Sequence, residues 1–437
     1  MHIQNAHARG GVAMVNLRKY LALLLVAAVT ANAAGCANSA VTANALSAAD
    51  LMEDQSPNKV TGRPLDDTFT ASMADFSVEL FKRSVTDKEN ALLSPLSVML
   101  ALAMTANGAD GDTLTQMEAV LGGGIPLAKL NEYLYEYARK LPSTEKSKLK
   151  VANSLWFRDD GDSLQVQANF LQKNADFFGA KAYSAAFDSQ TIKDINNWVK
   201  SNTDGMIDAI LSEINSLDLL FLINAVVFDA EWQNVYYAED VRKSDFTNID
   251  GTIRNVDFMY SGEYSYLDDG RATGFLKPYA NGSYSFAALL PNEGISIGEY
   301  IESLTGEGFL DTIQKKQDVL VFTSMPKFSY DYTISLIETL KALGVRDAFD
   351  ETIADFGSMA ATTLGNGNIY ISQVLHKTFI AVDELGTKAG AVTMVAAASG
   401  SSAPVEPKIV NLDRPFVYAI IDNATNLPVF IGTLMAL

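Results

Sequence analysis

One uncharged stretch constrains this chain more than any other. Residues 389–404 contain no Asp, Glu, Lys, Arg or His, and most of their side chains are small. Apolar runs typical of strands lie on both sides, at 369–382 and 415–421. The stretch has too little bulk to be part of a core and too little charge for an ordinary solvated loop. Long segments of this kind are usually functional or disordered.

The stretch also fits the two-residue period of a strand. Alternate residues on one face are small or β-branched and none is charged: Thr387, Ala389, Ala391, Thr393, Val395 and Ala397. Lys388 falls on the other face, where water could reach it. The segment could therefore lie exposed as a loop or slide into a sheet as a strand. The alternative interpretation is a flexible Gly/Ala/Ser linker.

Composition excludes several kinds of function. The chain has 437 residues and a net charge of −19, and an acidic surface repels nucleic acids and anionic membranes. Of its three histidines, two lie within the first ten residues, so only His376 is left for a metal site or a catalytic triad. No P-loop or dinucleotide-binding motif is present, so we expect no metal and no cofactor.

The first 36 residues resemble a signal peptide. Arg18 and Lys19 precede an apolar run at 20–29 that is too short to span a bilayer. Residues 31–33 fit an Ala-x-Ala cleavage site, whereas residues 33–36 resemble a bacterial lipobox ending in Cys36, the only cysteine. We favour lipidation of Cys36, with plain secretion as the alternative, and both predict an extracellular or cell-surface location.

The rest of the chain is predicted to be a flexible tether followed by one domain. Residues 37–68 are polar and lack periodicity, whereas no break divides residues 69–437. The apolar run 221–228, interrupted by Asn224, predicts a buried strand, and 333–343 predicts an amphipathic helix. The acidic residues 159–162 could suggest calcium, but the twelve-residue loop pattern is absent, so we predict a solvated turn.

Motifs along residues 69–437 resemble those of the serpins, the serine protease inhibitors. They occur in the family's order: Asn90…Ser94-Pro95…Ser97, Asn196-x-Trp198-Val199, Asn224…Phe228…Trp232, Pro326-Lys327-Phe328, Leu343-Gly344…Phe349, Ala354-Asp355-Phe356, His376-Lys377, Asp383-Glu384-x-Gly386-Thr387, Arg414-Pro415-Phe416 and Pro428-Val429-Phe430-Ile431-Gly432. Each motif is weak alone, but the ordered set is specific.

The resemblance implies an α+β fold of three sheets and about nine helices, with an exposed reactive-centre loop at about 384–404. A serine protease attacks this loop and forms an acyl-enzyme, and the cut loop then inserts into the central sheet and carries the protease with it. This is suicide inhibition rather than enzymatic turnover. The inhibitor is expected to be a monomer.

The resemblance also assigns roles to individual residues. The hinge, where the loop begins to insert, comprises Glu384, Gly386, Thr387, Ala389 and Ala391. The shutter, a polar cluster under the sheet that must open, comprises Ser94, Ser97, Asn224 and His376. The breach, where the loop first meets the sheet, comprises Trp232, Lys327 and Glu384. His376 is thus expected to be a hydrogen-bonded core residue.

Family spacing places the cleaved bond near Gly400 or Ser401, within 397–402. No Arg, Lys or large aromatic residue lies between Ala389 and Pro404, so we predict elastase-like or subtilisin-like target proteases. Two other functions stay open. A non-inhibitory serpin would act as a binding or chaperone-like protein, but such members tend to carry bulky or charged residues on the inserting face. A hydrolase using His376 would need a nucleophile motif, which the sequence lacks.

Overall fold

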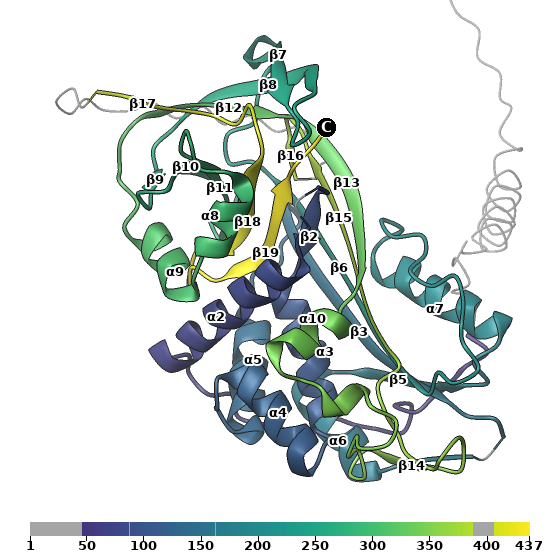
Figure 1. Cartoon of the computed structure of the whole chain (residues 1–437). Helices are drawn as coiled ribbons and strands as arrows, with labels where there is room; N and C mark the ends of the chain where they lie inside the picture. Colours follow the sequence, from purple (N-terminus) through teal and green to yellow (C-terminus); the bar gives the residue numbers. More distant parts are fainter. Residues whose placement is uncertain (1–45, 87, 162, 388–405) are drawn as a thin grey trace, which may run out of the picture. The chain divides into compact units, whose positions relative to one another are not determined.

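The computed structural model describes residues 46–86, 88–161, 163–387 and 406–437. These residues form helices and strands in alternating blocks (Figure 1). The helices are α2 (Asp67–Ser84), α3 (Pro95–Ala106), α4 (Gly111–Gly122), α5 (Leu127–Lys140), α6 (Ala168–Phe178), α7 (Ser189–Asn202), α8 (Ile297–Ser303), α9 (Gly306–Gln314) and α10 (Ile337–Leu343), with short 3-10 turns η1 (Ala238–Asp240) and η2 (Asp347–Phe349).

A seven-stranded sheet is the largest element of the fold. Its order is β1 (Ala49–Asp50), β5 (Lys181–Ala185), β3 (Ser147–Arg158), β6 (Leu220–Glu231), β16 (Gly386–Thr387), β15 (Gln373–Val382) and β13 (Phe328–Ser335). β16 occupies only one end of its place in this order. Along the rest of their length β6 and β15 pair directly and in parallel, from Phe221–Gln373 to Val226–Thr378.

Two further sheets complete the body of the domain. The six-stranded sheet has the order β2 (Ala91–Leu93), β19 (Pro428–Leu434), β18 (Phe416–Asp422), β11 (Tyr284–Pro291), β10 (Ala272–Pro278) and β9 (Tyr266–Asp268). The four-stranded sheet has the order β17 (Lys408–Asn411), β12 (Val321–Pro326), β8 (Ile253–Glu263) and β7 (Val241–Thr247). A two-stranded ribbon joins β4 (Leu164–Val166) to β14 (Ala360–Thr362). This arrangement confirms the expected α+β fold.

The central strand β6 is buried on both faces of the large sheet from Leu220 to Phe228. Its alternate residues point to opposite sides, so they pack in two different clusters. On one face Ile223 and Ala225 of β6 pack in a cluster with Ile195 and Val199 of α7. On the other face Leu222 and the remaining alternate residues join the main core. Figure 1 shows α7 on the opposite side of the sheet from α3 and α5.

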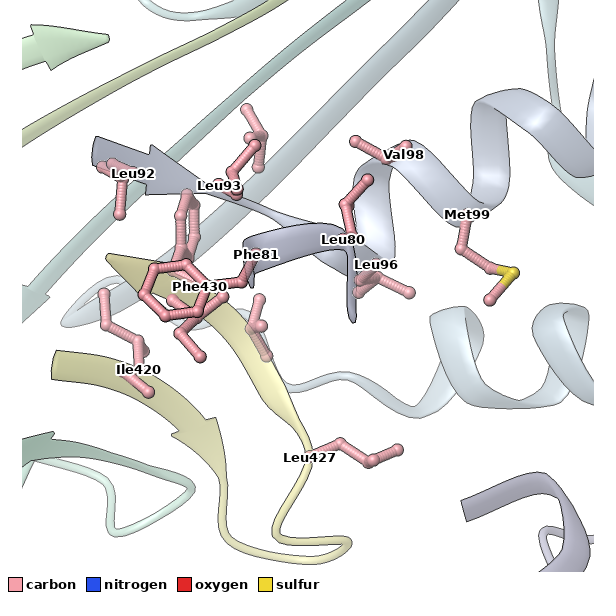
Figure 2. Packing of buried hydrophobic residues seen from close by; sticks show 14 of the residues in the cluster. Leu80, Phe81, Leu92, Leu93, Leu96, Val98, Met99, Ile420, Leu427 and Phe430 are labelled. Atoms are coloured by element: carbon pink, nitrogen blue, oxygen red, sulfur yellow. The ribbon is translucent and has the colours of Figure 1, made fainter. Parts of the chain in front are cut away.

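The main core joins helices α2 and α3 to the six-stranded sheet. Figure 2 shows Phe81 of α2 beside Phe430 of β19, with Ile420 of β18 close by, whereas Leu80 of α2 lies toward Leu96 of α3. α2 starts at a true cap, since the Asp66 carboxylate accepts the Phe69 amide at 3.0 Å. Because these elements are far apart in sequence, the core connects both ends of the domain.

Two boundaries expected from the sequence are wrong. The predicted helix at 333–343 begins only at Ile337, because Thr333 and Ser335 pair with Lys377 and Leu375 of β15. Here pairing with a distant strand outweighs a local helical pattern. The expected tether 37–68 also fails over its described part, because the compact unit begins at Leu46.

Residues 46–66 lie against the domain through carboxylates that composition could not reveal. The Ser47 and Ala48 amides donate to the Asp194 carboxylate at 2.8 and 2.9 Å. Further along, Arg63 pairs with Glu132 at 2.9 Å. Within the described part of the chain, no helix combines the length and apolarity needed to cross a bilayer.

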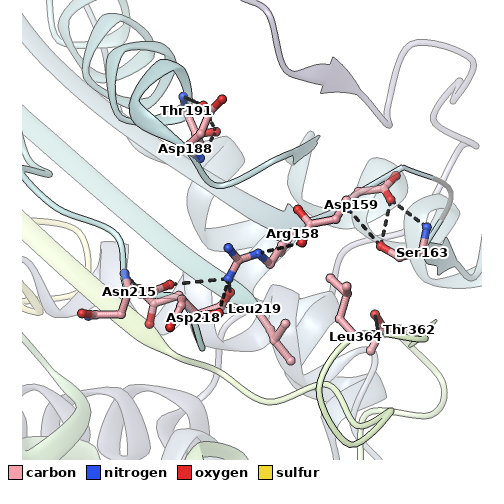
Figure 3. Close-up of polar contacts among 12 residues, drawn as sticks. Arg158, Asp159, Ser163, Asp188, Thr191, Asn215, Asp218, Leu219, Thr362 and Leu364 are labelled. Atoms are coloured by element: carbon pink, nitrogen blue, oxygen red, sulfur yellow. Dashed lines mark hydrogen bonds and ion pairs between the residues drawn. The ribbon is translucent and has the colours of Figure 1, made fainter.

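The acidic residues near position 160 form a turn at the end of β3 (Figure 3). The Asp159 carboxylate accepts hydrogen bonds from both the amide and the hydroxyl of Ser163. Arg158 donates to the Ser216 carbonyl at 2.6 Å and lies 3.4 Å from the Asp160 carboxylate. The described residues hold no group of three or more acidic, His or Cys side chains arranged for a metal ion.

Candidate functional site

The candidate site lies where the seven-stranded sheet is split. Gly386 and Thr387 form β16 between β6 and β15, and Thr387 pairs with Ala230 on one side and Val382 on the other. Both pairings are antiparallel. The sheet is therefore open at this end and holds the first two residues of an additional strand.

Thr387 is already buried in this opening, with 1% of its surface exposed. Its hydroxyl lies 2.6 Å from the hydroxyl of Tyr279, which follows β10 and is fully buried. Burial raises the pKa of Tyr279 well above its usual value, so this phenol stays protonated and able to donate. The predicted hinge residue therefore points into the core rather than toward solvent.

Gly386 is required by a close approach of two backbones. A Cβ atom built on Gly386 would lie 2.0 Å from the Ala230 carbonyl oxygen, inside any permitted contact distance. Only glycine lets the strand come this close to β6.

A turn of three residues, 383–385, joins β15 to β16 and is held by the segment after β6. Trp232 donates its Nε1–H to the Asp383 carbonyl and its backbone amide to the Leu385 carbonyl, at 2.9 and 2.8 Å. The Tyr236 amide donates to the Glu384 carbonyl at 2.9 Å. We call residues 383–385 the hinge turn.

Trp232 itself is fixed by stacking on Tyr279, with ring centroids 4.6 Å apart and planes within 14°. Next to it, the Lys327 ammonium pairs with the Glu384 carboxylate at 2.8 Å, and both side chains are about one-third exposed. Burial acts to raise the pKa of Glu384, but the hydrogen bond from Lys327 holds it below its usual value. The three predicted breach residues thus lie together around the hinge turn.

The four predicted shutter residues also lie together, where β6 and β15 pair. The Ser94 amide donates to His376 Nε2 at 3.1 Å, so the ring proton is on Nδ1, which faces Asn224 Oδ1. The Asn224 amide group in turn donates to Ser97 Oγ. Register places Asn224 directly beside His376.

His376 is completely buried, and burial lowers its pKa to about 3. A neutral ring without access to solvent or substrate is unsuited to act as a general base. This geometry argues against the hydrolase alternative.

The sequence analysis missed Asn153 of β3, a further member of this cluster. It accepts from Asn224 and donates to the Ser97 carbonyl, the latter at 3.2 Å. Its signal is present in the sequence, since Asn153 interrupts an apolar strand in the same way as Asn224, its register partner. Tyr279 was missed as well, because nothing local marks the partner of its hydroxyl.

Several predicted residues lie outside the described part of the chain. They are the lipidation residue Cys36, the hinge residues Ala389 and Ala391, and the cleavage positions Gly400 and Ser401. The loop's two described ends are Thr387 in the large sheet and Glu406, which precedes β17.

The central sheet is thus split at one end, and the first two residues of the strand that leads into the loop lie in the opening. Comparison with known proteins gives the class of protein, because residues 71–437 match the family model described as "Serpin (serine protease inhibitor)". The chain belongs to the serpin family.

Three relatives show the extent of the similarity. The native-state crystal structure of tengpin, a thermophilic serpin, has a TM-score of 0.85 and 54% identity, covering 89% of this chain and all of that one. An uncharacterized serpin-like protein of Thermococcus kodakarensis is 31% identical, covering 82% of this chain and 84% of its own length. Human antithrombin-III is 30% identical, covering 80% of this chain and 77% of its own length.

Proposed function

We propose that this protein is a suicide inhibitor of serine proteases that acts by loop cleavage, acyl-enzyme trapping and loop insertion. The observation that carries the proposal is the position of Thr387, which is already paired on both sides between β6 and β15. An additional strand has therefore begun, and the loop that would extend it follows directly.

Continuing the register of β16 gives the destination of each later residue. Ala389 would lie opposite Ile380 and Phe228, and two residues further the loop would face Thr378 and Val226. These neighbours on β6 and β15 are buried. The small, uncharged face of the loop suits such surroundings, because an unpaired charge there would be costly.

The same register leads the loop through the shutter. Thr393 would lie opposite Asn224 and His376, which at present bond to each other. Insertion would separate this pair, and the Thr393 hydroxyl could then form hydrogen bonds with both Asn224 and His376. A polar residue at this position meets the general need of buried polar groups for hydrogen bonds.

The distance travelled explains why insertion would trap the protease. About 13 residues at about 3.3 Å each give a movement of about 43 Å. A domain of this size is about 50–55 Å across. The acylated protease would thus be carried most of the way across the molecule, and its active site would be distorted before water could release it.

The loop composition supports a particular class of target. The absence of Arg, Lys and large aromatic residues between Ala389 and Pro404 disfavours trypsin-like and chymotrypsin-like enzymes. Elastase-like or subtilisin-like proteases accept small residues, and we place the cleaved bond at or near Gly400 and Ser401. Cys36 would carry lipid that holds the monomer at the cell surface.

The test is incubation with a panel of serine proteases followed by denaturing gels. We expect an elastase-like enzyme to give an adduct that survives boiling in detergent, whereas trypsin is not inhibited quickly. The cleaved inhibitor should melt at a higher temperature than the intact one, because the loop becomes a paired central strand. If every protease cuts the loop and remains active, the non-inhibitory alternative is the better description.

A further inference from the structure

A buried ion pair lies next to Trp232 of the breach, and the function proposed above gives it no role. The Lys277 ammonium of β10 lies 2.8 Å from the Glu263 carboxylate of β8, and the two side chains are 2% and 6% exposed. Ser261 donates to the same carboxylate at 2.7 Å. The pair links the six-stranded sheet to the four-stranded sheet.

The ammonium of Lys277 also contacts the two residues that hold the hinge turn. It lies 4.2 Å from the ring centre of Tyr236 and 5.4 Å from that of Trp232. Cations attract the faces of aromatic rings, and the attraction is strongest where water is excluded. The ammonium therefore fixes both rings from one point.

Backbone hydrogen bonds connect the same segments. Gln233 donates to the Pro278 carbonyl at 3.0 Å, and Ala280 donates to the Glu231 carbonyl at 2.8 Å. The segment after β6 is thus joined to the residues that follow Lys277. From there, the bonds of Trp232 and Tyr236 reach the hinge turn.

A buried ion pair is a poor device for stability alone. Apolar residues of similar size can often replace such a pair without loss of stability. What an apolar pair cannot supply is a fixed charge that orients two aromatic rings. This difference points to a role in geometry.

We propose that Lys277, held by Glu263, is a positioning residue for loop insertion. It orients Trp232 and Tyr236 so that the hinge turn stays folded and Thr387 is kept in register between β6 and β15. This inference rests on the proposed function, since it concerns the start of the same insertion. Without the pair, the turn loosens and the loop loses its prepared starting point.

The test replaces both charges, Lys277→Met with Glu263→Leu, because removing one alone would leave a buried charge unpaired. We expect the intact variant to melt at or above the wild-type temperature. Hydrogen exchange followed by mass spectrometry should nevertheless be faster at residues 383–387. With an elastase probe, insertion should slow about tenfold, equivalent to about 1.4 kcal/mol, so that more inhibitor is cleaved for each protease trapped.

Two further variants make the test specific. Lys277→Gln with Glu263→Gln keeps polar side chains at both positions and removes both charges, and it should shift exchange at 383–387 in the same direction. Lys82→Met with Glu79→Leu removes a pair on α2 with a separation of 2.9 Å and should change neither measurement. Unchanged exchange at 383–387, or equal changes in the α2 control, would overturn the proposal.

Exchange is measured without any protease. If no protease forms an adduct with the wild type, the proposed function fails, while exchange still decides whether Lys277 holds the hinge turn. A purely structural role for the pair would instead lower the melting temperature and speed exchange throughout the domain.

Discussion

Under the proposed mechanism, replacing Thr387 by Arg should turn the protein from an inhibitor into a substrate of the protease. Thr387 is 1% exposed, and its neighbours Ala230, Val382 and Tyr279 offer no carboxylate to a guanidinium. Burying an unpaired charge costs several kcal/mol even after relaxation. The arginine would therefore keep β16 out of the sheet and oppose the first step of insertion.

The magnitude follows from a race between two rates. Inhibition requires that insertion be faster than hydrolysis of the acyl-enzyme. If the substitution adds about 2.7 kcal/mol to the insertion barrier, insertion slows about a hundredfold. Hydrolysis then wins for most molecules, so the protease cleaves the loop of Thr387→Arg and escapes.

The assay counts inhibitor molecules consumed per protease inactivated. Two controls separate charge from other effects. Lys388→Glu changes a charge on the face expected to meet solvent, and it should leave the count nearly unchanged. Thr387→Val keeps the shape but loses the bond to Tyr279, which is worth about 1 kcal/mol. If Thr387→Arg inhibits as well as the wild type, or Lys388→Glu is the damaging change, the assignment of the inserting face is wrong.

Four other changes have expected outcomes. The pKa of His376 is about 3 in the folded protein and about 6.5 in the unfolded chain, so the unfolded state binds more protons between these two pH values. The free energy of unfolding should therefore fall by about 1.4 kcal/mol per pH unit as the pH drops from about 6.5 toward 3. Urea titrations should show this slope, and His376→Asn should flatten it. Gly386→Ala would place a methyl group 2.0 Å from a carbonyl of β6 and should speed exchange at the hinge, whereas Gly357→Ala, with no atom nearer than 3.7 Å, should not. Asn153→Ala removes hydrogen bonds from Asn224 and the Ser97 carbonyl, so it should lower the free energy of unfolding by about 1–3 kcal/mol. A urea titration that gives the wild-type stability would contradict this. Cys36→Ser should release the protein from the membrane fraction, and unchanged fractionation would favour plain secretion.

The fold was predictable because ordered motifs recur across the whole domain, and the grouping of polar residues was predictable where each interrupts an apolar strand. Asn224 and His376 are of this kind, and register brings them side by side. Long-range pairing was not predictable from local pattern, which is why Thr333 was assigned to a helix instead of β13. The partner of Glu263 could not be found either, because Lys277 is distant in sequence and belongs to another sheet.

The resemblance to the serpins identifies the hinge residues, but it does not give their conformation. The alternation of residues 387–397 indicates which face could enter a sheet, without indicating that Thr387 is already paired within it. The pairing of Thr387 depends on Ala230 and Val382, and its burial depends on Tyr279, none of which a local pattern contains.

The order of strands in the six-stranded sheet bears on how the protein is made. β18 and β19 lie between β11 and β2, yet they follow all other described strands in the sequence. During synthesis, the ribosome must therefore release residues 416–434 before β2 can join the rest of its sheet. Until then Leu92 and Phe286, which are both buried in the finished domain, lack their neighbouring strands β19 and β18. A nascent chain stalled before residue 416 would lack the middle of a sheet rather than an edge, and it would be a ready target for chaperones and quality-control proteases.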